Sequence, residues 1–238
     1  MARRNVRLLD ELSRVRPDLE DPPGAIDAGL VRVNGSVVTN PDSRIERGAS
    51  IVVARATDLR GRRKLAAALD GFGVLVDGRV ALDVGAAAGG FTSALLERGA
   101  RRVYAVDAGH GQLLGSLRQD DRVVNLEGTN IADLDRTLVP DRVDLVTIDV
   151  SYLSLSDAVG QVTMLTFSPA AELVGLVKPM FELRLAEAPT DTETLARAME
   201  AAERGISAAG WLVTGRMRSA VGGAKGAIEG FVHARYPG

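Results

Sequence analysis

The sequence of 238 residues contains no cysteine and only two histidines, His110 and His233, which lie far apart in the chain. Without cysteine there are no disulfide bonds and no thiolate metal ligands, and two separated histidines do not indicate a metal centre, so we expect no metal. The chain also lacks an apolar run of about 18 residues, the length that a membrane-spanning helix needs. Its start, MARRNVRLLDEL, has neither the apolar segment nor the cleavage site of a secretory signal. We therefore expect a cytoplasmic protein that does not bind membranes.

Lysine is scarce, with three residues against 26 arginines, although the net charge is only −2. Arginine supplies charge but stays protonated in proteins, whereas lysine can lose its proton and act as a base. In the segment LVGLVKPMFE an apolar run ends in Lys178. A lysine kept at the end of a buried strand is therefore a candidate for proton transfer.

Residues 6–53 have the pattern of a small α+β domain. Apolar residues at helical spacing in 8–15 predict a helix, and a second short helix is expected before Gly29. Two strands flank the pair Asn34 and Gly35, which is a strong hairpin signal, and the segment RGASIVV supplies a closing strand. This order resembles the small RNA-binding domain that a small-subunit ribosomal protein shares with pseudouridine synthases and tyrosyl-tRNA synthetases.

A basic run joins this part to the rest of the chain. Residues 55–64, RATDLRGRRK, carry five basic residues and one acidic residue. A solvated linker is the plainer interpretation, and a phosphate-binding run is the alternative if its neighbours handle nucleic acid. We predict a small domain at 1–54, a basic linker at 55–64 and a larger domain at 65–238. The candidate RNA-binding residues are Arg60, Arg62 and Arg63.

The larger domain alternates short apolar runs with helical stretches. This spacing predicts an α/β fold, with a Rossmann-like parallel sheet and right-handed crossovers. A long helix is expected at 192–209, followed by two more strands in GWLVTGRMRS and GAIEGFVHAR. The other candidate strands are 80–84, 103–106, 123–126, 143–149 and 173–177.

The first of these strands runs into a glycine-rich turn, ALDVGAAAGGFTSALLERG. Gly85, Gly89 and Gly90 would let the backbone approach a ligand closely, at the N-terminus of the helix that follows. The turn departs from the dinucleotide spacing Gly-x-Gly-x-x-Gly because Ala87 stands at the second glycine. By itself it is consistent with a dinucleotide, with S-adenosylmethionine or with no ligand.

The next strand ends in Asp107, about twenty residues after the turn, where a carboxylate can accept hydrogen bonds from both ribose hydroxyls. The alternative is that Asp107 caps a helix near Gly111. Thr129 and Asn130 follow the third strand, where an adenine edge could be recognised. These positions favour a cofactor that carries a ribose. The candidate cofactor-binding residues are Asp83, Gly85, Ala86, Gly89, Gly90, Phe91, Asp107, Thr129, Asn130 and Asp149.

Asp149 and Lys178 end the fourth and fifth strands. Ligands of open parallel sheets bind beyond the carboxyl ends of the strands, so we expect both side chains to reach one crevice. A buried structural ion pair is the alternative.

Six blocks taken together resemble the TlyA (hemolysin A) family, ribosomal RNA 2′-O-methyltransferases with an FtsJ-like catalytic domain. The blocks are RGRRKL, LDVGAAAGGFTSALLERGA, VDAGHGQL, VDLVTIDVSYLSL, LVKPMFE and GAIEGF. The resemblance implies a seven-stranded methyltransferase sheet, S-adenosylmethionine as cofactor, ribosomal RNA or ribosomal subunits as partner, and the ribose of a cytidine as target. The catalytic set that it implies is Lys64, Asp149, Lys178 and Glu229.

The roles that we assign to this set are a base, its organiser and two substrate-positioning residues. Lys178 would be the base and Asp149 its organiser, while Lys64 and Glu229 would position the substrate. Acidic residues outnumber arginines by eight to six in 6–53, so a methyltransferase acting on another RNA or on a small molecule stays an alternative. The others are a non-catalytic RNA-binding factor and a hemolysin, although no basic amphipathic helix for membrane insertion is evident.

Overall fold

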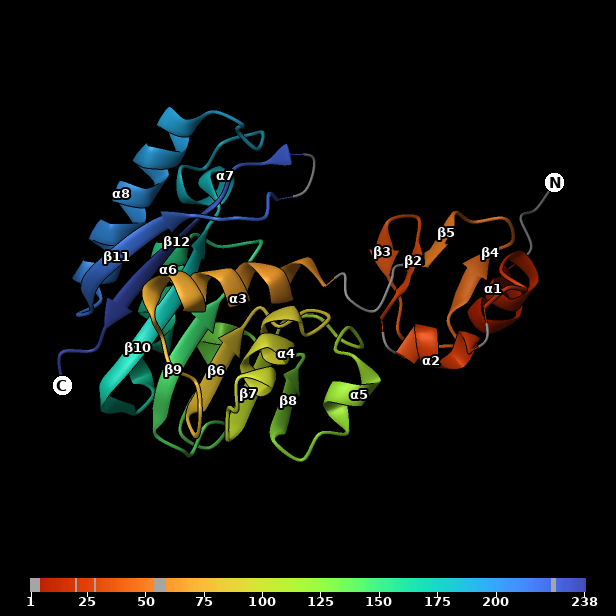
Figure 1. Ribbon diagram of the computed structural model, residues 1–238, viewed down its shortest axis with the longest axis horizontal. Coiled ribbons are helices and arrows are strands. Elements are labelled where there is room, and N and C mark those ends of the chain that lie inside the picture. The colour runs from red at the N-terminus through yellow and green to blue at the C-terminus, as the bar shows by residue number, and fades with distance from the viewer. Residues whose placement is uncertain (1–4, 20, 28, 54–58, 224–225) are drawn as a thin grey trace.

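The computed structural model describes residues 5–19, 21–27, 29–53, 59–223 and 226–238. A small N-terminal part stands beside a larger part built on one sheet (Figure 1). In the small part, β2 pairs with β3 and β5 in a three-stranded antiparallel sheet, and β1 pairs with β4. Its elements are β1 (Asn5–Arg7), α1 (Leu8–Val15), α2 (Pro22–Asp27), β2 (Val31–Val33), β3 (Ser36–Val37), β4 (Arg44–Glu46) and β5 (Ile51–Val53).

The small part has a core of its own, which the apolar faces of its helices and strands form. Leu8 and Leu12 of α1 pack with Ile26 of α2 and with Val31 and Val33 of β2. The predicted hairpin is present, and its two turn residues, Asn34 and Gly35, have positive φ values of 50° and 88°. Such φ values suit the type of turn that asparagine and glycine favour between two strands.

The basic run differs from the prediction. Residues 54–58 lie outside the described residues, but α3 (Arg60–Phe72) is helical, so the second half of the expected linker, 60–64, opens a helix. The reason is that Leu65, Ala68 and Leu69 bury one face of this helix against the larger core. We propose that the larger domain begins with α3 rather than at residue 65.

The larger part contains the predicted seven-stranded sheet. Its strands are β6 (Val80–Val84), β7 (Arg102–Asp107), β8 (Val123–Glu127), β9 (Val143–Ile148), β10 (Phe167–Val177), β11 (Leu212–Arg218) and β12 (Gly230–Arg235). Their order in the sheet is β11-β12-β10-β9-β6-β7-β8. The strands from β10 to β8 are parallel, whereas β12 is antiparallel to both β10 and β11.

Helices cover both faces of this sheet. One apolar cluster joins the sheet to α3, α4 (Gly90–Glu97) and α5 (Gly115–Arg118), and Figure 1 shows α3 and α4 in front of the strands. A second cluster joins it to α6 (Leu155–Gln161) and α8 (Thr192–Ala208). Three short elements complete this part: η1 (Ile131–Asp133), η2 (Val162–Met164) and α7 (Pro179–Glu182).

The two parts touch through the loop that follows β7. Thr39 Oγ1 donates a hydrogen bond of 2.5 Å to the Gly111 carbonyl. Gly29 packs so closely on Leu114 that a Cβ there would lie 2.2 Å from a Leu114 methyl carbon. These contacts set the small part beside the carboxyl ends of the parallel strands.

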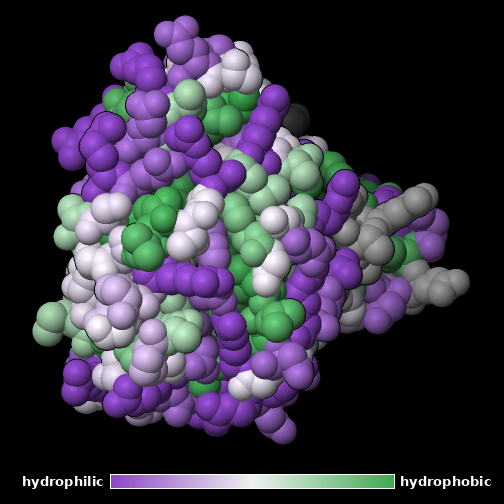
Figure 2. All heavy atoms as spheres, turned by 60° about the vertical axis from the view of Figure 1, so that its left-hand side comes forward, coloured by the Kyte–Doolittle hydropathy of each residue, from purple (hydrophilic) through white to green (hydrophobic). Residues whose placement is uncertain are grey.

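One face of the larger part is a mixture of polar and apolar residues. Figure 2 brings the side of α8 and β11 forward and shows hydrophilic residues over much of it, with separate apolar patches among them. Within the described ranges, no helix combines the length and apolar character that crossing a membrane requires.

Candidate active site

Neighbouring strands deliver the candidate residues to one edge of the sheet. Lys178, Asp149 and Gly85 each come directly after the last residue of β10, β9 and β6, which are adjacent and parallel, and Asp107 ends β7. Two cavities open at this edge. The larger, of about 650 Å³, borders Gly85, Asp149 and the start of α3, and the smaller, of about 330 Å³, borders Lys178. Arg60 lines both cavities, so they are neighbours.

The glycine turn forms the floor of the larger cavity. The amides of Gly85 and Ala86 donate to the Val106 carbonyl at 2.8 and 3.0 Å, which anchors the turn to β7. Gly85 has φ 84°, and a Cβ there would lie 2.3 Å from the Asp149 carbonyl oxygen. Gly89 has φ 91°, and α4 begins at the next residue. Glycine is needed at both positions, because a Cβ would collide with the Asp149 main chain at Gly85 and with the Leu117 side chain at Gly89.

Asp107 connects the glycine turn to the next loop. Its Oδ2 accepts a hydrogen bond of 2.8 Å from the Ala87 amide, and its Oδ1 accepts one of 2.7 Å from the Gly109 amide. It does not cap a helix, because α5 starts at Gly115 with Leu114 as its N-cap residue. Each carboxylate oxygen can accept a further hydrogen bond, so the side chain keeps the capacity to bind ribose hydroxyls.

Asp83 lines neither cavity, and its predicted cofactor contact stays a prediction. It is fully buried, and its oxygens accept hydrogen bonds from Thr92 Oγ1 at 2.6 Å and from Thr147 Oγ1 at 3.0 Å. Burial raises the pKa of Asp83 to about 7, although the two threonines oppose this shift. Asp83 therefore ties β6 to α4 and β9.

The raised pKa of Asp83 predicts a pH-dependent stability. Between its ordinary pKa of 3.8 and about 7 the folded state holds more protons on Asp83 than the unfolded state, so stability contributed by this group falls as pH rises. Each unit of pKa shift corresponds to about 1.4 kcal/mol. We expect Asp83→Asn to flatten the dependence of the free energy of unfolding between pH 5 and pH 7, measured by urea denaturation. The same pH dependence of the free energy of unfolding in both proteins would contradict the raised pKa of Asp83.

Thr129 and Asn130 lie next to Asp107 but do not line the larger cavity. The Thr129 amide donates to the Asp107 carbonyl at 3.0 Å. Asn130 Oδ1 accepts from the Ala132 amide at 3.1 Å and so caps η1. The predicted contact with an adenine edge stays a prediction for both residues.

Asp149 and Lys178 form an ion pair where the two cavities meet. The distance from Lys178 Nζ to Asp149 Oδ1 is 2.5 Å, and Nζ also donates to Ser151 Oγ at 2.8 Å. The Lys178 side chain is 16% exposed and the Asp149 side chain is 22% exposed, so the pair is shielded but within reach of a ligand. Lys178 stands between the end of β10 and Pro179, which begins α7 and cannot continue the strand.

Lys64 and Glu229 form a second, more deeply buried ion pair. Lys64 Nζ donates to Glu229 Oε2, and the side chains are only 9% and 7% exposed. The pair joins α3 to the start of β12, and both residues line the smaller cavity together with Lys178. The structure thus brings all four predicted catalytic residues together. Apolar and small side chains make up much of the remaining wall: Pro179, Met180, Phe181, Ala188, Pro189, Ala227 and Ile228.

The three predicted RNA-binding arginines differ in their surroundings. Arg60 lines both cavities, and Arg63 is exposed on the same helix. Arg62 instead pairs with Glu97 of α4 at 2.7 Å. Its charge is therefore partly neutralised within the protein.

Two contributors to the site were missed by the sequence reasoning. Glu182 accepts hydrogen bonds from the Leu155 amide, at 2.7 Å, and from Ser156 Oγ, and burial raises the pKa of Glu182. It joins the segment after Lys178 to the segment after Asp149. The second is the β2–β3 hairpin, from which Arg32 and Val37 line the larger cavity. Glu182 stands in the block LVKPMFE, but no spacing along the chain indicates its bonds to Leu155 and Ser156. Nor does any spacing indicate that the hairpin reaches the cavity.

The geometry suits a ribose-bearing cofactor beside an acceptor pocket. A glycine-containing turn that lines the cavity, a carboxylate at the end of β7 and a polar edge after β8 are the groups that such a cofactor needs. Within the described part of the chain, no cluster of three or more histidine, aspartate or glutamate residues could hold a metal ion.

The sequence matches the family of FtsJ-like methyltransferases over residues 59–223, which is more than half of the chain. The fold and the match define an enzyme of the methyltransferase class. A relative from Mycobacterium tuberculosis strain H37Rv, the 16S/23S rRNA (cytidine-2′-O)-methyltransferase TlyA, is 38% identical over 88% of this chain and 81% of its own. Hemolysin A of Brachyspira hyodysenteriae is 34% identical over 87% and 89%.

Among solved structures, a protein of Streptococcus thermophilus described as a candidate hemolysin superposes with a TM-score of 0.71. It is 28% identical, and the match covers 99% of this chain and 90% of that one. The chain belongs to the TlyA (hemolysin A) family of FtsJ-like methyltransferases.

Proposed function

We propose that the protein transfers a methyl group from S-adenosylmethionine to the 2′-hydroxyl of a ribose in ribosomal RNA. The observation that carries this proposal is the position of Lys178, which lines the apolar smaller cavity and pairs with Asp149 at the wall of the larger one. The M. tuberculosis relative is named for cytidine 2′-O-methylation of 16S and 23S rRNA. We therefore propose cytidine as the target nucleotide.

The larger cavity and the loops beside it fit S-adenosylmethionine. Gly85, Ala86 and Gly90 line the cavity and would hold the cofactor close to the sheet, and Asp107 would accept hydrogen bonds from its ribose hydroxyls. Thr129 and Asn130 would recognise the adenine. The cofactor, when bound, supplies an electrophilic methyl group.

Lys178 is the proposed base. A ribose hydroxyl becomes a good nucleophile only as its proton leaves, and a positioned base contributes to that step. Lys178 in its uncharged form would accept the proton at Nζ, while Asp149 and Ser151 hold Nζ in place. The Asp149 carboxylate then stabilises the resulting ammonium. Holding the hydroxyl at reacting distance supplies a further part of the rate.

The smaller cavity is the proposed acceptor site. Its volume of about 330 Å³ is at the lower end of the range for small-ligand pockets, which suits one nucleoside rather than a duplex. Pro179, Phe181 and Pro189 offer apolar surface to a base, and Lys64 with Glu229 would position its ribose. A nucleotide inside a helix must leave its stack to reach such a pocket, so we expect the target to lie in a loop or to flip out.

Methyl transfer from labelled S-adenosylmethionine tests the proposal. Intact ribosomes, separated subunits and naked ribosomal RNA are offered in parallel, and the label is mapped to a nucleotide by nuclease digestion. We expect incorporation at a 2′-oxygen of a cytidine in at least one substrate. Tight cofactor binding without incorporation into any of these RNAs would reject it, and incorporation into small molecules of a cell extract would favour a metabolite as substrate.

Arg62 and Arg63 give a matched pair for testing the RNA contact of α3. Arg63→Ala should lower the slope of log affinity against log salt by close to one unit, because each phosphate contact releases about 0.7 to 0.9 counterions. Arg62→Ala should change the slope much less, because Glu97 already pairs with its guanidinium. Filter binding to ribosomal RNA at several salt concentrations measures both slopes. Equal slopes for wild type and Arg63→Ala would favour the alternative that the basic run is only a solvated surface.

A further inference from the structure

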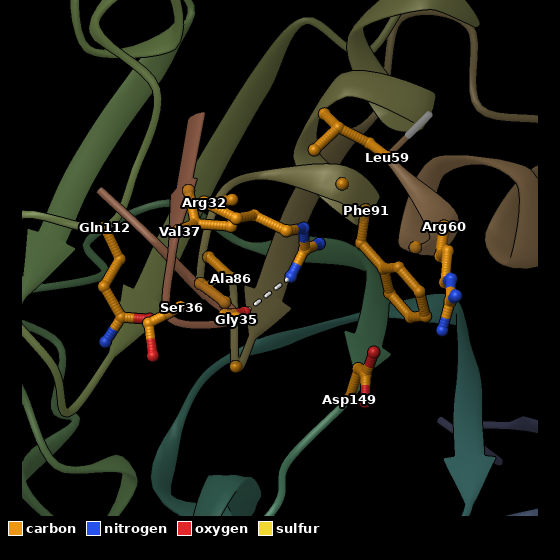
Figure 3. Close-up of a pocket in the computed structure, with 15 residues that line it drawn as sticks. Arg32, Gly35, Ser36, Val37, Leu59, Arg60, Ala86, Phe91, Gln112 and Asp149 are labelled. Atoms are coloured by element: carbon orange, nitrogen blue, oxygen red, sulfur yellow. Dashed lines mark hydrogen bonds between the residues drawn. The ribbon is translucent and has the colours of Figure 1, made fainter. Parts of the chain in front are cut away.

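The small N-terminal part forms one wall of the larger cavity. Arg32, Gly35, Ser36 and Val37, all from the β2–β3 hairpin, line it together with residues of the glycine turn (Figure 3). The cavity is therefore built by two parts of the chain that are far apart in sequence. Because the catalytic sheet contributes only some of its walls, the hairpin can supply groups that the sheet lacks.

The local sequence explains why Arg32 faces outward. Val31 and Val33 are buried in the core of the small part, and the alternation of a strand turns Arg32 to the opposite face. Arg32 lies on the central strand, across from Val37 and Val52. Its Nη1 donates a hydrogen bond of 3.1 Å to the Gly35 carbonyl, which steadies the guanidinium over the turn. Figure 3 shows the guanidinium directed from the hairpin into the cavity, toward the side of Phe91.

The charges around the cavity favour an anionic group beside Arg32. Two arginines, Arg32 and Arg60, line it, and the only acidic side chain in the lining, Asp149, is engaged by Lys178. Neither arginine makes an ion pair within the part of the chain that the structure describes. A guanidinium with free donors is suited to a carboxylate, which it can bind with two parallel hydrogen bonds.

The lining also indicates which end of the cofactor this cavity would take. Asp107, Thr129 and Asn130, the proposed contacts of the adenosine, do not belong to it. The space beside the glycine turn and the hairpin is therefore left for the other end of S-adenosylmethionine, which is an amino acid with a free carboxylate.

We propose that Arg32 binds the carboxylate of the amino acid end of S-adenosylmethionine, so that the N-terminal hairpin supplies a cofactor ligand to the catalytic domain. This inference rests on the proposed function. The contacts of Thr39 with Gly111 and of Gly29 with Leu114 hold the hairpin at the cavity. The same arginine would select against cofactor-like molecules that lack the carboxylate.

Calorimetric titration of the full chain with two ligands tests the role of Arg32. The ligands are S-adenosylmethionine and its decarboxylated form, which differ only in the carboxylate. We expect Arg32→Ala to weaken binding of S-adenosylmethionine about 10-fold or more, the usual scale for a lost charge-assisted hydrogen bond, and to leave binding of the decarboxylated form unchanged. Arg32→Lys should restore part of the lost affinity.

Arg44→Ala is the matched control, because Arg44 is an exposed arginine on β4 outside this cavity. It should bind both ligands as the wild type does. An unchanged affinity of Arg32→Ala for S-adenosylmethionine, or equal losses for both ligands, would overturn the proposal. Failure of the wild type to bind S-adenosylmethionine at all would instead contradict the proposed function, so the two failures are distinguishable. Circular dichroism verifies that the variants fold.

Discussion

Lys178→Arg is expected to lower methyl transfer by about 100-fold or more while the protein folds and binds S-adenosylmethionine, because a general base contributes about that much to a rate. Arginine keeps the positive charge that faces Asp149 but cannot give up its proton. The measurement is the initial rate of methyl transfer to ribosomal RNA at saturating cofactor. Arginine is larger than lysine, so an unchanged affinity for S-adenosylmethionine is needed to show that the site is intact when the rate is compared.

Lys225→Arg serves as the control, since Lys225 is the third lysine of the chain and stands outside the proposed catalytic set; it lies outside the described residues. Its activity should stay close to that of the wild type. The initial rates of the two proteins at several pH values give a second measurement: if Lys178 is the base, its replacement should change the shape of the profile and not only its height. Near-normal turnover of Lys178→Arg would mean that solvent takes the proton.

Glu229→Ala is expected to have the largest effect on stability. It leaves Lys64 as an unpaired charge in a site where its side chain is only 9% exposed, and breaking one partner of a buried pair costs about 3 to 5 kcal/mol. Urea denaturation measures this loss. Asp70→Ala is the control, because Asp70 pairs with Arg98 at the surface, where such pairs contribute up to about 1 kcal/mol.

A double variant, Lys64→Met with Glu229→Leu, separates folding from catalysis. Replacing both charges by apolar side chains of similar volume should recover most of the stability that Glu229→Ala loses. If the pair positions the ribose in the acceptor cavity, methyl transfer should stay low in this stable protein. A double variant that is both stable and active would limit the pair to a structural role.

Much of the fold could be predicted because its signals are local. The predicted strands at 80–84, 103–106 and 123–126 match β6, β7 and β8 closely, and the hairpin at Asn34 and Gly35 is present. The ends of parallel strands meet at one edge of a sheet, so the meeting of Asp149 with Lys178 followed from topology alone.

Features that depend on packing could not be predicted in this way. The charged residues of 55–64 predict a linker. The apolar face that makes α3 a helix begins only at Leu65, so these residues by themselves do not indicate a helix. The direction of the Asp83 side chain could not be predicted, because β6 is buried along its whole length and no alternation of polar and apolar residues indicates which way a side chain points. The position of Arg32 at the larger cavity depends on how the small part docks on the larger part. No pattern in a single sequence predicts such docking.

The place of β12 in the sheet affects when activity can arise. This strand is inserted between β10 and β11, and the residue before it, Glu229, meets Lys64 across 165 positions of sequence. Chains fold from the N-terminus as they are synthesised, but a strand that fills an interior gap can enter only after it has been made. The acceptor pocket therefore has no complete wall on a nascent chain. The proposed methyl transfer would therefore be confined to chains in which β12 has been made and has entered the sheet.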